Sequence, residues 1–78
     1  MTTLVLELLA WVAARPRTYG ETMAAWRTSC PQMPVWEDAT SAGLVEVVRT
    51  DGRGLEQHEV RLTRLGREVL ASAARGAE

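Results

Sequence analysis

The sequence predicts a small α+β domain in which three helices are followed by a two-stranded β-hairpin and a C-terminal helix. Three observations lead to this prediction. Apolar residues recur at helical spacing in the first half of the chain, two strand-like stretches flank a glycine-rich turn, and a threonine-capped amphipathic segment closes the chain. The 78 residues make one domain, 1–78, in which residues 75–78 are expected to fray.

The composition narrows the class of protein. A single cysteine excludes an internal disulfide and, with a single histidine, a metal cluster, so we expect no metal and no cofactor. The formal net charge of −1 is weakly acidic, whereas dedicated nucleic-acid binders are often strongly basic. The apolar stretch from Leu4 to Val12 is short and interrupted by Glu7, so we expect neither a signal peptide nor a membrane span and a cytoplasmic location.

The first helix is predicted to run from Thr3, which can cap it, to Arg15, because the following Pro16 disfavours helical backbone. Its inward stripe is predicted to consist of Val5, Leu8, Leu9 and Val12. Leu4 and Trp11 add a second apolar flank. That flank either completes a helix at the centre of the core or packs against a second subunit, and the second alternative predicts a homodimer.

The second helix is predicted from the pattern Thr-x-x-Glu at Thr18 and Glu21. In such a capping box each side chain bonds to the backbone N–H of the other residue, so two of the unpaired donors at the start of a helix are satisfied. Tyr19, Met23 and Trp26 follow at helical spacing and are expected to form one buried face.

A short third helix is predicted from Pro34, at its first position, to Ala42. Proline has no backbone N–H to donate and suits the first turn, where the N–H groups have no partner within the helix. Trp36 and Ala39 form the predicted inward side, and Gly43 is the stop signal.

Two strands are predicted, at Leu44 to Thr50 and at His58 to Thr63. The turn Asp51-Gly52-Arg53-Gly54 lies between them, and the loop that continues to about Gln57 should protrude and be mobile. Thr63 is expected to cap the last helix. The predicted inward residues of that helix are Leu65, Val69 and Ala73.

Over Ala42 to Leu70 the chain resembles the winged helix-turn-helix superfamily, most closely its multiple-antibiotic-resistance-regulator (MarR) type. The matching residues are Gly43-Leu44-Val45 after the third helix, Asp51-Gly52-Arg53 in the wing, and Val60-Arg61-Leu62-Thr63 with Gly66 at the entry to the last helix. The resemblance implies that the third helix is a recognition helix in the major groove of DNA and that the hairpin is the wing. It therefore implies a DNA-binding transcriptional regulator.

The resemblance also implies which residues contact nucleic acid. Arg53 at the wing tip matches the wing arginine of the family, and its guanidinium suits the negative potential of a narrow minor groove. Arg49 and Arg61, on the two strands, are candidates for phosphate contacts. The turn before the third helix adds Arg27, Ser29 and Gln32.

The predicted recognition helix departs from the family pattern. Glu37 and Asp38 fall in its first turn, and no basic residue lies between Gln32 and Val48, so the helix opposes attraction to phosphate. The alternative function is a winged helix that binds protein, or a second copy of itself, and not DNA. It would use a small apolar surface rimmed with acid. The residues of that surface would be Pro34, Val35, Glu37 and Asp38.

Few residues suggest a redox, metal-binding or catalytic function. Cys30, before the third helix, is either a redox-sensitive thiol or the far commoner structural one. His58 has no partner of catalytic or ligating type nearby in the sequence. Because no nucleophile, base and orienting group can be assembled, we do not expect an enzyme. The expected partners are DNA, a second copy of the chain or another protein, with no membrane.

Overall fold

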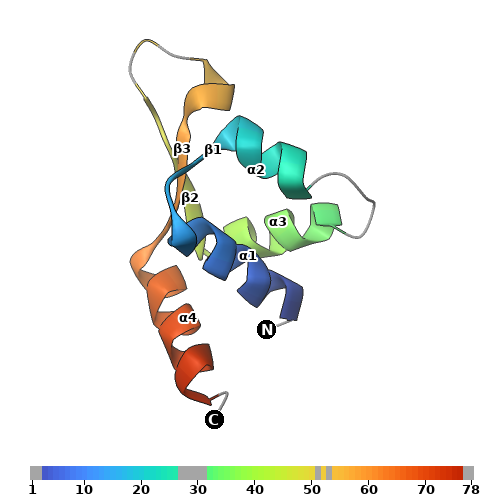
Figure 1. The fold of residues 1–78 in the computed structure, drawn as a ribbon, viewed down its shortest axis with the longest axis vertical. Coiled ribbons are helices and arrows are strands. Elements are labelled where there is room, and N and C mark those ends of the chain that lie inside the picture. Colours follow the sequence, from blue (N-terminus) through green and yellow to red (C-terminus); the bar gives the residue numbers. More distant parts are fainter. Residues whose placement is uncertain (1–2, 27–31, 51, 53, 77–78) are drawn as a thin grey trace.

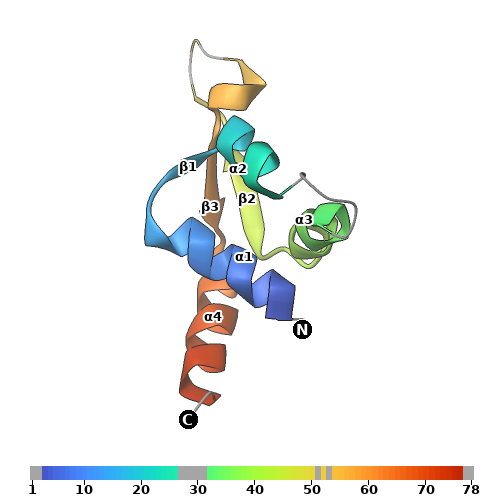
Figure 2. The same ribbon diagram turned by 45° about the vertical axis from the view of Figure 1, so that its right-hand side comes forward.

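The structure, a computed structural model, describes residues 3–26, 32–50, 52 and 54–76. Its elements are α1 (Thr3–Ala14), β1 (Arg17–Thr18), α2 (Tyr19–Trp26), α3 (Gln32–Ser41), β2 (Val45–Val48), the 3-10 helix η1 (Leu55–Gln57), β3 (Glu59–Leu62) and α4 (Arg64–Gly76). Helices α1 to α3 lie on one side of a small sheet, the β2–β3 hairpin projects beyond them, and α4 extends away at the opposite end (Figures 1 and 2). This is the predicted α+β winged helix-turn-helix arrangement.

The sheet contains one strand more than predicted. Its antiparallel strands are ordered β1-β3-β2, so the predicted hairpin of β2 and β3 is present and β1 is added on the far side of β3. In the added pairing Arg17 faces Val60 and Thr18 faces Glu59. A strand of two residues is too short to show an alternating pattern, so only the pairing with β3 defines it. It ties the chain between α1 and α2 to the wing.

The core lies between α1, α3 and the sheet. The predicted stripe of α1 is confirmed, because its four residues are all buried. The residues that complete the buried cluster are Val35, Ala39, Leu44, Val45, Val60 and Leu62. Leu8 and Leu9 are completely covered, so α1 is the central helix of this small core.

The second apolar flank of α1 is mostly covered by the same chain. The rings of Trp11 and Trp26 of α2 meet edge to face, with centroids 6.1 Å apart. The Arg17 guanidinium lies 3.8 Å from the centre of the Trp11 ring, and Arg17 Nε donates to the Trp11 carbonyl at 3.0 Å. Of this flank Leu4 stays exposed, at 40%. Trp11 is therefore occupied within the chain and does not offer the subunit contact considered above.

The predicted capping box at the start of α2 is present. The Glu21 N–H donates to Thr18 Oγ1 at 3.0 Å, and the Thr18 N–H donates to Glu21 Oε1 at 3.2 Å. The residues predicted to form its buried face are only half-buried: Tyr19, Met23 and Trp26. The fully buried residue is Thr22, whose hydroxyl donates to the Thr18 carbonyl at 2.8 Å. That bond offsets the cost of removing the hydroxyl from water.

Two helices begin elsewhere than predicted. Thr3 is the first helical residue of α1 and not its cap. Helix α3 begins at Gln32, so Pro34 lies within its first turn instead of at its first position. Proline is tolerated throughout the first turn, because the N–H groups of that turn have no partner within the helix and a missing N–H therefore breaks no hydrogen bond. Helix α3 ends at Ser41, and Gly43 has the left-handed φ of 73° that the stop signal requires.

Helix α4 is locked against the turn that follows α3. Thr63 caps it as predicted, since Thr63 Oγ1 accepts from the Gly66 N–H at 3.0 Å and also donates to the Gly43 carbonyl. The Thr63 N–H donates to the Leu44 carbonyl at 3.0 Å. A Cβ on Gly66 would lie only 2.0 Å from that same oxygen. The two segments that carry the family resemblance, Gly43-Leu44-Val45 and Leu62-Thr63 with Gly66, therefore contact each other through their backbones.

The apolar face of α4 is only partly covered. Leu65, which was predicted to point inward, is 48% exposed, and Ala73 is half-buried. Val69 and Leu70 pack against the core, while the rest of the helix extends beyond the other elements (Figure 1). The helix runs to Gly76, into the segment expected to fray, and residues 77 and 78 lie outside the described residues. One apolar side of α4 is therefore open.

Glu21 gives a testable pH dependence. The Arg15 guanidinium and the Thr18 N–H bond to its carboxylate and lower the pKa of Glu21 below its ordinary value. Because the pKa is lower in the folded state, this contribution to stability is complete above the ordinary pKa of a glutamate and is lost as the pH falls through the lowered one. Arg15→Met should raise the midpoint of the Glu21 titration, followed by carboxyl carbon NMR.

The matched control for this titration is Arg75→Met, which removes a distant arginine of α4. The Glu21 midpoint should be the same in this variant as in the unsubstituted protein. An unchanged midpoint in Arg15→Met would show that the guanidinium does not set the pKa of Glu21.

Candidate nucleic-acid interface

The surface predicted to contact DNA is built from α2, α3 and the wing (Figure 2). Helices α2 and α3 meet where the rings of Tyr19 and Trp36 pack edge to face, with centroids 6.0 Å apart. Val35 and Ala39 lie one turn apart on the side of α3 that faces the body of the protein, and both are buried. These contacts hold α3 against the body and leave its opposite side facing outward.

The outward side of α3 is acidic. Glu37 and Asp38 are exposed, and within the described residues neither side chain forms a hydrogen bond or an ion pair. Thr40 is exposed as well, but its hydroxyl donates to the Trp36 and Glu37 carbonyls of its own helix, at 3.0 and 3.1 Å. The described side chains of α3 therefore present negative charge to any approaching phosphate.

The apolar surface expected for a protein-binding alternative is not formed as predicted. The expectation is wrong for Val35, which is 4% exposed and belongs to the core. It faces inward because it lies one turn before Ala39, on the side of α3 that packs against the body. The side chain of Pro34 lies outside the described residues. Of the described side chains of this predicted protein-binding surface, those of Glu37 and Asp38 are exposed.

The two strand arginines differ in what they can bind. Arg61 lies opposite Glu46 in the register of β2 and β3, and Arg61 Nε is 3.3 Å from Glu46 Oε2. The two residues occupy the sheet face opposite the buried Val45 and Val60, so Arg61 points away from α3. Arg49 follows β2 at the base of the wing, is exposed, and has no ion pair within the described residues. Of the two, Arg49 is therefore the arginine that no described side chain neutralises.

Several residues predicted to contact nucleic acid lie outside the part of the chain that the structure describes: Arg27, Ser29, Arg53 and the side chain of Gln32. The backbone of Gln32 forms the first residue of α3. Their roles in nucleic-acid contact stay predictions. Cys30 also lies outside the described residues.

The wing loop is anchored to α2 on one side. Where only a protruding loop was predicted, Leu55–Gln57 form η1, and this turn lies against the start of α2. A Cβ on Gly20 would lie 3.2 Å from the Glu56 carbonyl oxygen. Directly after η1, the His58 carbonyl accepts from the Tyr19 N–H at 2.8 Å. The sequence did not predict this contact between α2 and η1, because the two segments are far apart in the chain and no local residue pattern indicates that they pair.

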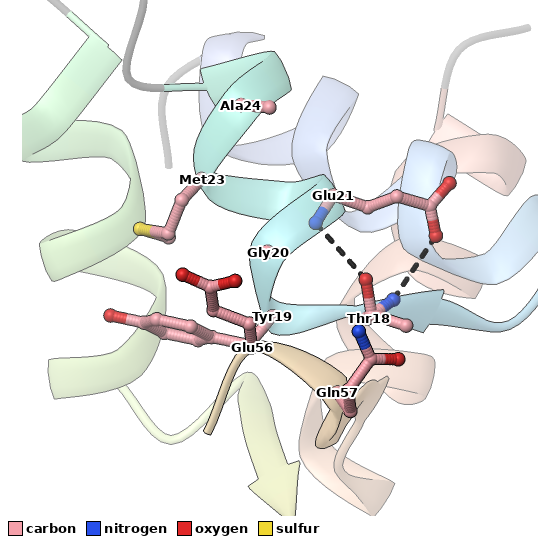
Figure 3. A pocket seen from close by; sticks show the side chains of 8 residues that line it. All are labelled: Thr18, Tyr19, Gly20, Glu21, Met23, Ala24, Glu56 and Gln57. Carbon is pink, nitrogen blue, oxygen red and sulfur yellow. Dashed lines mark hydrogen bonds between the residues drawn. The ribbon is translucent and has the colours of Figure 1, made fainter. Parts of the chain in front are cut away.

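A cavity of about 440 Å³ opens between α2 and η1 (Figure 3). Its lining residues are Thr18, Tyr19, Gly20, Glu21, Met23, Ala24, Glu56 and Gln57. In Figure 3 the Tyr19 ring, the Met23 thioether and the Glu56 carboxylate extend to the same side of α2, whereas Glu21 turns toward Thr18. The only signal in the sequence is the spacing that places Tyr19 and Met23 one turn apart.

A second hollow, of about 430 Å³, lies between the end of α1, β3 and the start of α4. Three arginines line it, and each guanidinium is already bonded within the chain. Arg15 bonds to Glu21, and Arg61 bonds to Glu46. The third, Arg67, donates to a backbone carbonyl of β3.

Over the described part of the chain, no group of three or more His, Cys, Asp or Glu side chains is placed to hold a metal ion. No helix among those residues has the length and hydropathy to cross a membrane.

Comparison with known proteins supports the fold. No family model and no curated protein matches this chain. The chain is similar to the crystal structure of the transcriptional regulator BldR from Sulfolobus solfataricus, with a TM-score of 0.69 and 21% sequence identity. The match covers 96% of this chain and 54% of that one, so the chain spans about half the length of BldR. The similarity shows a shared fold, which is the α+β winged helix-turn-helix arrangement predicted from the sequence.

Proposed function

We propose that this protein is a cytoplasmic, DNA-associated transcriptional regulator that binds through its wing and the turn between α2 and α3. The distribution of charge over the winged-helix fold carries the proposal: the outward side of α3 is acidic, and Arg49, at the base of the wing, has no ion pair among the residues that the structure describes. The sequence adds Arg53 at the wing tip and Arg27 in the turn. A basic rim around an acidic centre favours contacts to the DNA backbone over base contacts from α3.

A titration of the protein with a labelled mixed-sequence duplex tests this proposal. Because binding to phosphates releases counterions, the affinity should fall steeply as the salt concentration rises. Arg49→Ala and Arg53→Ala should each weaken binding roughly three- to tenfold and reduce the salt slope by about 1.

The control for this titration is Arg64→Ala, which removes an exposed arginine already paired with Glu68 on α4. This variant should bind DNA as the unsubstituted protein does. The proposal fails if no binding occurs at low salt, or if the Arg64 variant loses as much affinity as the wing variants.

We also propose that the regulator acts as a homodimer that pairs through α4. The open apolar side of α4 supports this, because Leu65 is half-exposed there and the helix extends beyond the other elements (Figure 1). A single chain offers few arginine contacts, whereas a pair doubles the contact area on a two-fold symmetric DNA site.

Light scattering tests the dimer. At high micromolar concentration the mass should be twice that of one chain, and Leu65→Glu should halve it by placing a charge in the shared face. Leu55→Glu is the matched control, because Leu55 is 55% exposed but lies in the wing loop, away from α4. A monomer at that concentration in the unsubstituted protein would exclude pairing through α4.

A further inference from the structure

We propose that the cavity between α2 and η1 binds a small organic ammonium ion that carries an aromatic or alkyl group. Its volume of about 440 Å³ lies within the range of small-molecule sites. One wall belongs to α2 of the helix-turn-helix and the other to η1 of the wing loop (Figure 3). A bound molecule would therefore touch both elements at once.

The free charge at the cavity is negative. The Glu56 carboxylate forms no hydrogen bond or ion pair within the described part of the chain. The other carboxylate, Glu21, is already engaged by the Arg15 guanidinium and by Thr18. As far as the structure describes the chain, none of the residues that line the cavity carries a positive charge. A cation in the cavity would find one uncompensated partner, Glu56.

An aromatic ring and a thioether surround the same space. The Tyr19 ring is half-buried, and its edge-to-face contact with Trp36 holds its orientation. In Figure 3 the Met23 sulfur and the Glu56 carboxylate lie on the same side of α2 as this ring. A cation is attracted to the face of an aromatic ring, and a polarizable thioether adapts to alkyl or aryl groups. Carboxylate, ring and thioether together suit an organic ammonium ion better than a hydrated metal ion.

Two of the N–H groups at the amino terminus of α2 are already bonded and are not offered to an anion. The Tyr19 N–H is already donated to the His58 carbonyl at 2.8 Å, and the Glu21 N–H is donated to the Thr18 hydroxyl at 3.0 Å. An incoming anion would also meet the Glu56 carboxylate, which no described residue neutralises. The arrangement therefore discriminates between ligands by the sign of their charge.

Binding at this site would bear on the wing. Gly20 and Glu56 approach each other closely and both line the cavity, so a molecule bound there would touch both sides of the joint between α2 and η1. If the ligand changes the affinity for DNA, then DNA must change the affinity for the ligand by the same factor. This coupling rests on the proposed DNA-binding function, whereas the ligand site itself does not.

The test is a ¹⁵N NMR titration with phenyltrimethylammonium in the absence of DNA. We expect chemical shift changes confined to the amides around Gly20, Met23 and Glu56, with a Kd of about 1 mM. Benzenesulfonate, an anion built on the same ring, should leave these amides unchanged. Glu56→Gln should weaken cation binding about tenfold, because it removes the charge and keeps the shape. Glu68→Gln, a matched change on α4, should bind as the unsubstituted protein does.

Three results would overturn the ligand site: shifts scattered over the surface, equal response to both probes, or a Glu56→Gln variant that binds as tightly as the parent. Since Glu56 is exposed, its substitution should leave the circular dichroism spectrum unchanged, which verifies that the fold is intact. Because the titration contains no DNA, a protein that binds the cation and not DNA would refute the proposed function alone.

Discussion

Replacing Gly66 with alanine should destabilise the protein by about 3 kcal/mol or more, at the upper end of what overpacking costs. The added methyl group would lie 2.0 Å from the Leu44 carbonyl oxygen and 2.9 Å from its carbonyl carbon. Both are backbone atoms, and the oxygen is also held by the Thr63 N–H, so no change of rotamer relieves the clash. The first turn of α4 would have to move away from Leu44.

Such a loss is a large part of the stability of a domain this small. At roughly 0.05–0.15 kcal/mol per residue, the whole chain has on the order of 4–12 kcal/mol. Thermal unfolding followed by circular dichroism should therefore show a Tm lower by more than about 10 °C in Gly66→Ala.

The control for this experiment is Gly76→Ala. Nothing lies within 4 Å of the Cβ position of Gly76, which sits at the far end of the same helix. Alanine is the better helix former by roughly 0.5–1 kcal/mol, so this variant should unfold at the same temperature or slightly higher. A Gly66→Ala variant that unfolds together with the Gly76→Ala variant would show that α4 does not press on Leu44 as described.

Neutralising the carboxylates of Glu37 and Asp38 on α3 should strengthen DNA binding about tenfold at low salt if this helix approaches phosphate. The reason is that two charges a few ångströms apart in water interact by about 1 kcal/mol. Glu37→Gln and Asp38→Asn together remove two exposed carboxylates that have no partner among the described residues, without changing their shape. The gain should shrink at higher salt, because mobile ions screen exposed charges. Titration with the mixed-sequence duplex measures it.

The matched control changes the net charge by the same amount elsewhere. Glu7→Gln with Glu68→Gln removes two carboxylates from α1 and α4, both exposed. If both double variants gain equally, the effect comes from net charge and not from the position of α3. If neither gains, α3 lies away from the DNA in the complex, and the contacts are confined to the wing and the turn.

Features that depend on neighbours within one helical turn could be predicted from the sequence. The Thr18–Glu21 box and the Thr63 cap form because their partners lie three residues away along the chain. Gly43 ends α3 because a positive φ at that position favours glycine. The burial of the α1 stripe followed from its helical spacing.

Features that depend on distant partners could not be predicted. The two residues of β1 become a strand only by pairing with β3. Val35 and Thr22 are buried and Leu65 is exposed because of what surrounds them. Val35 was predicted to lie on the outward side of its helix and Leu65 on the inward side, and a polar threonine gave no signal of burial. In the candidate site, the type of charge on each residue was readable, but the pairing of Arg61 with Glu46 required the strand register.

By itself, then, the sequence determined the order of the four helices and the two hairpin strands, the caps at Thr18 and Thr63, the stop at Gly43 and the acidic character of α3, since all of these are set by residue type and short spacing. Only the tertiary structure decided that Arg61 is paired across the strands while Arg49 has no partner among the described residues, that the wing loop is anchored to α2, and that a cavity lies between them whose Glu56 carboxylate is unpaired within the same residues. Those features arise where segments that are far apart in the chain come into contact. Such contacts depend on both segments together, so the residue pattern of either one alone does not predict them.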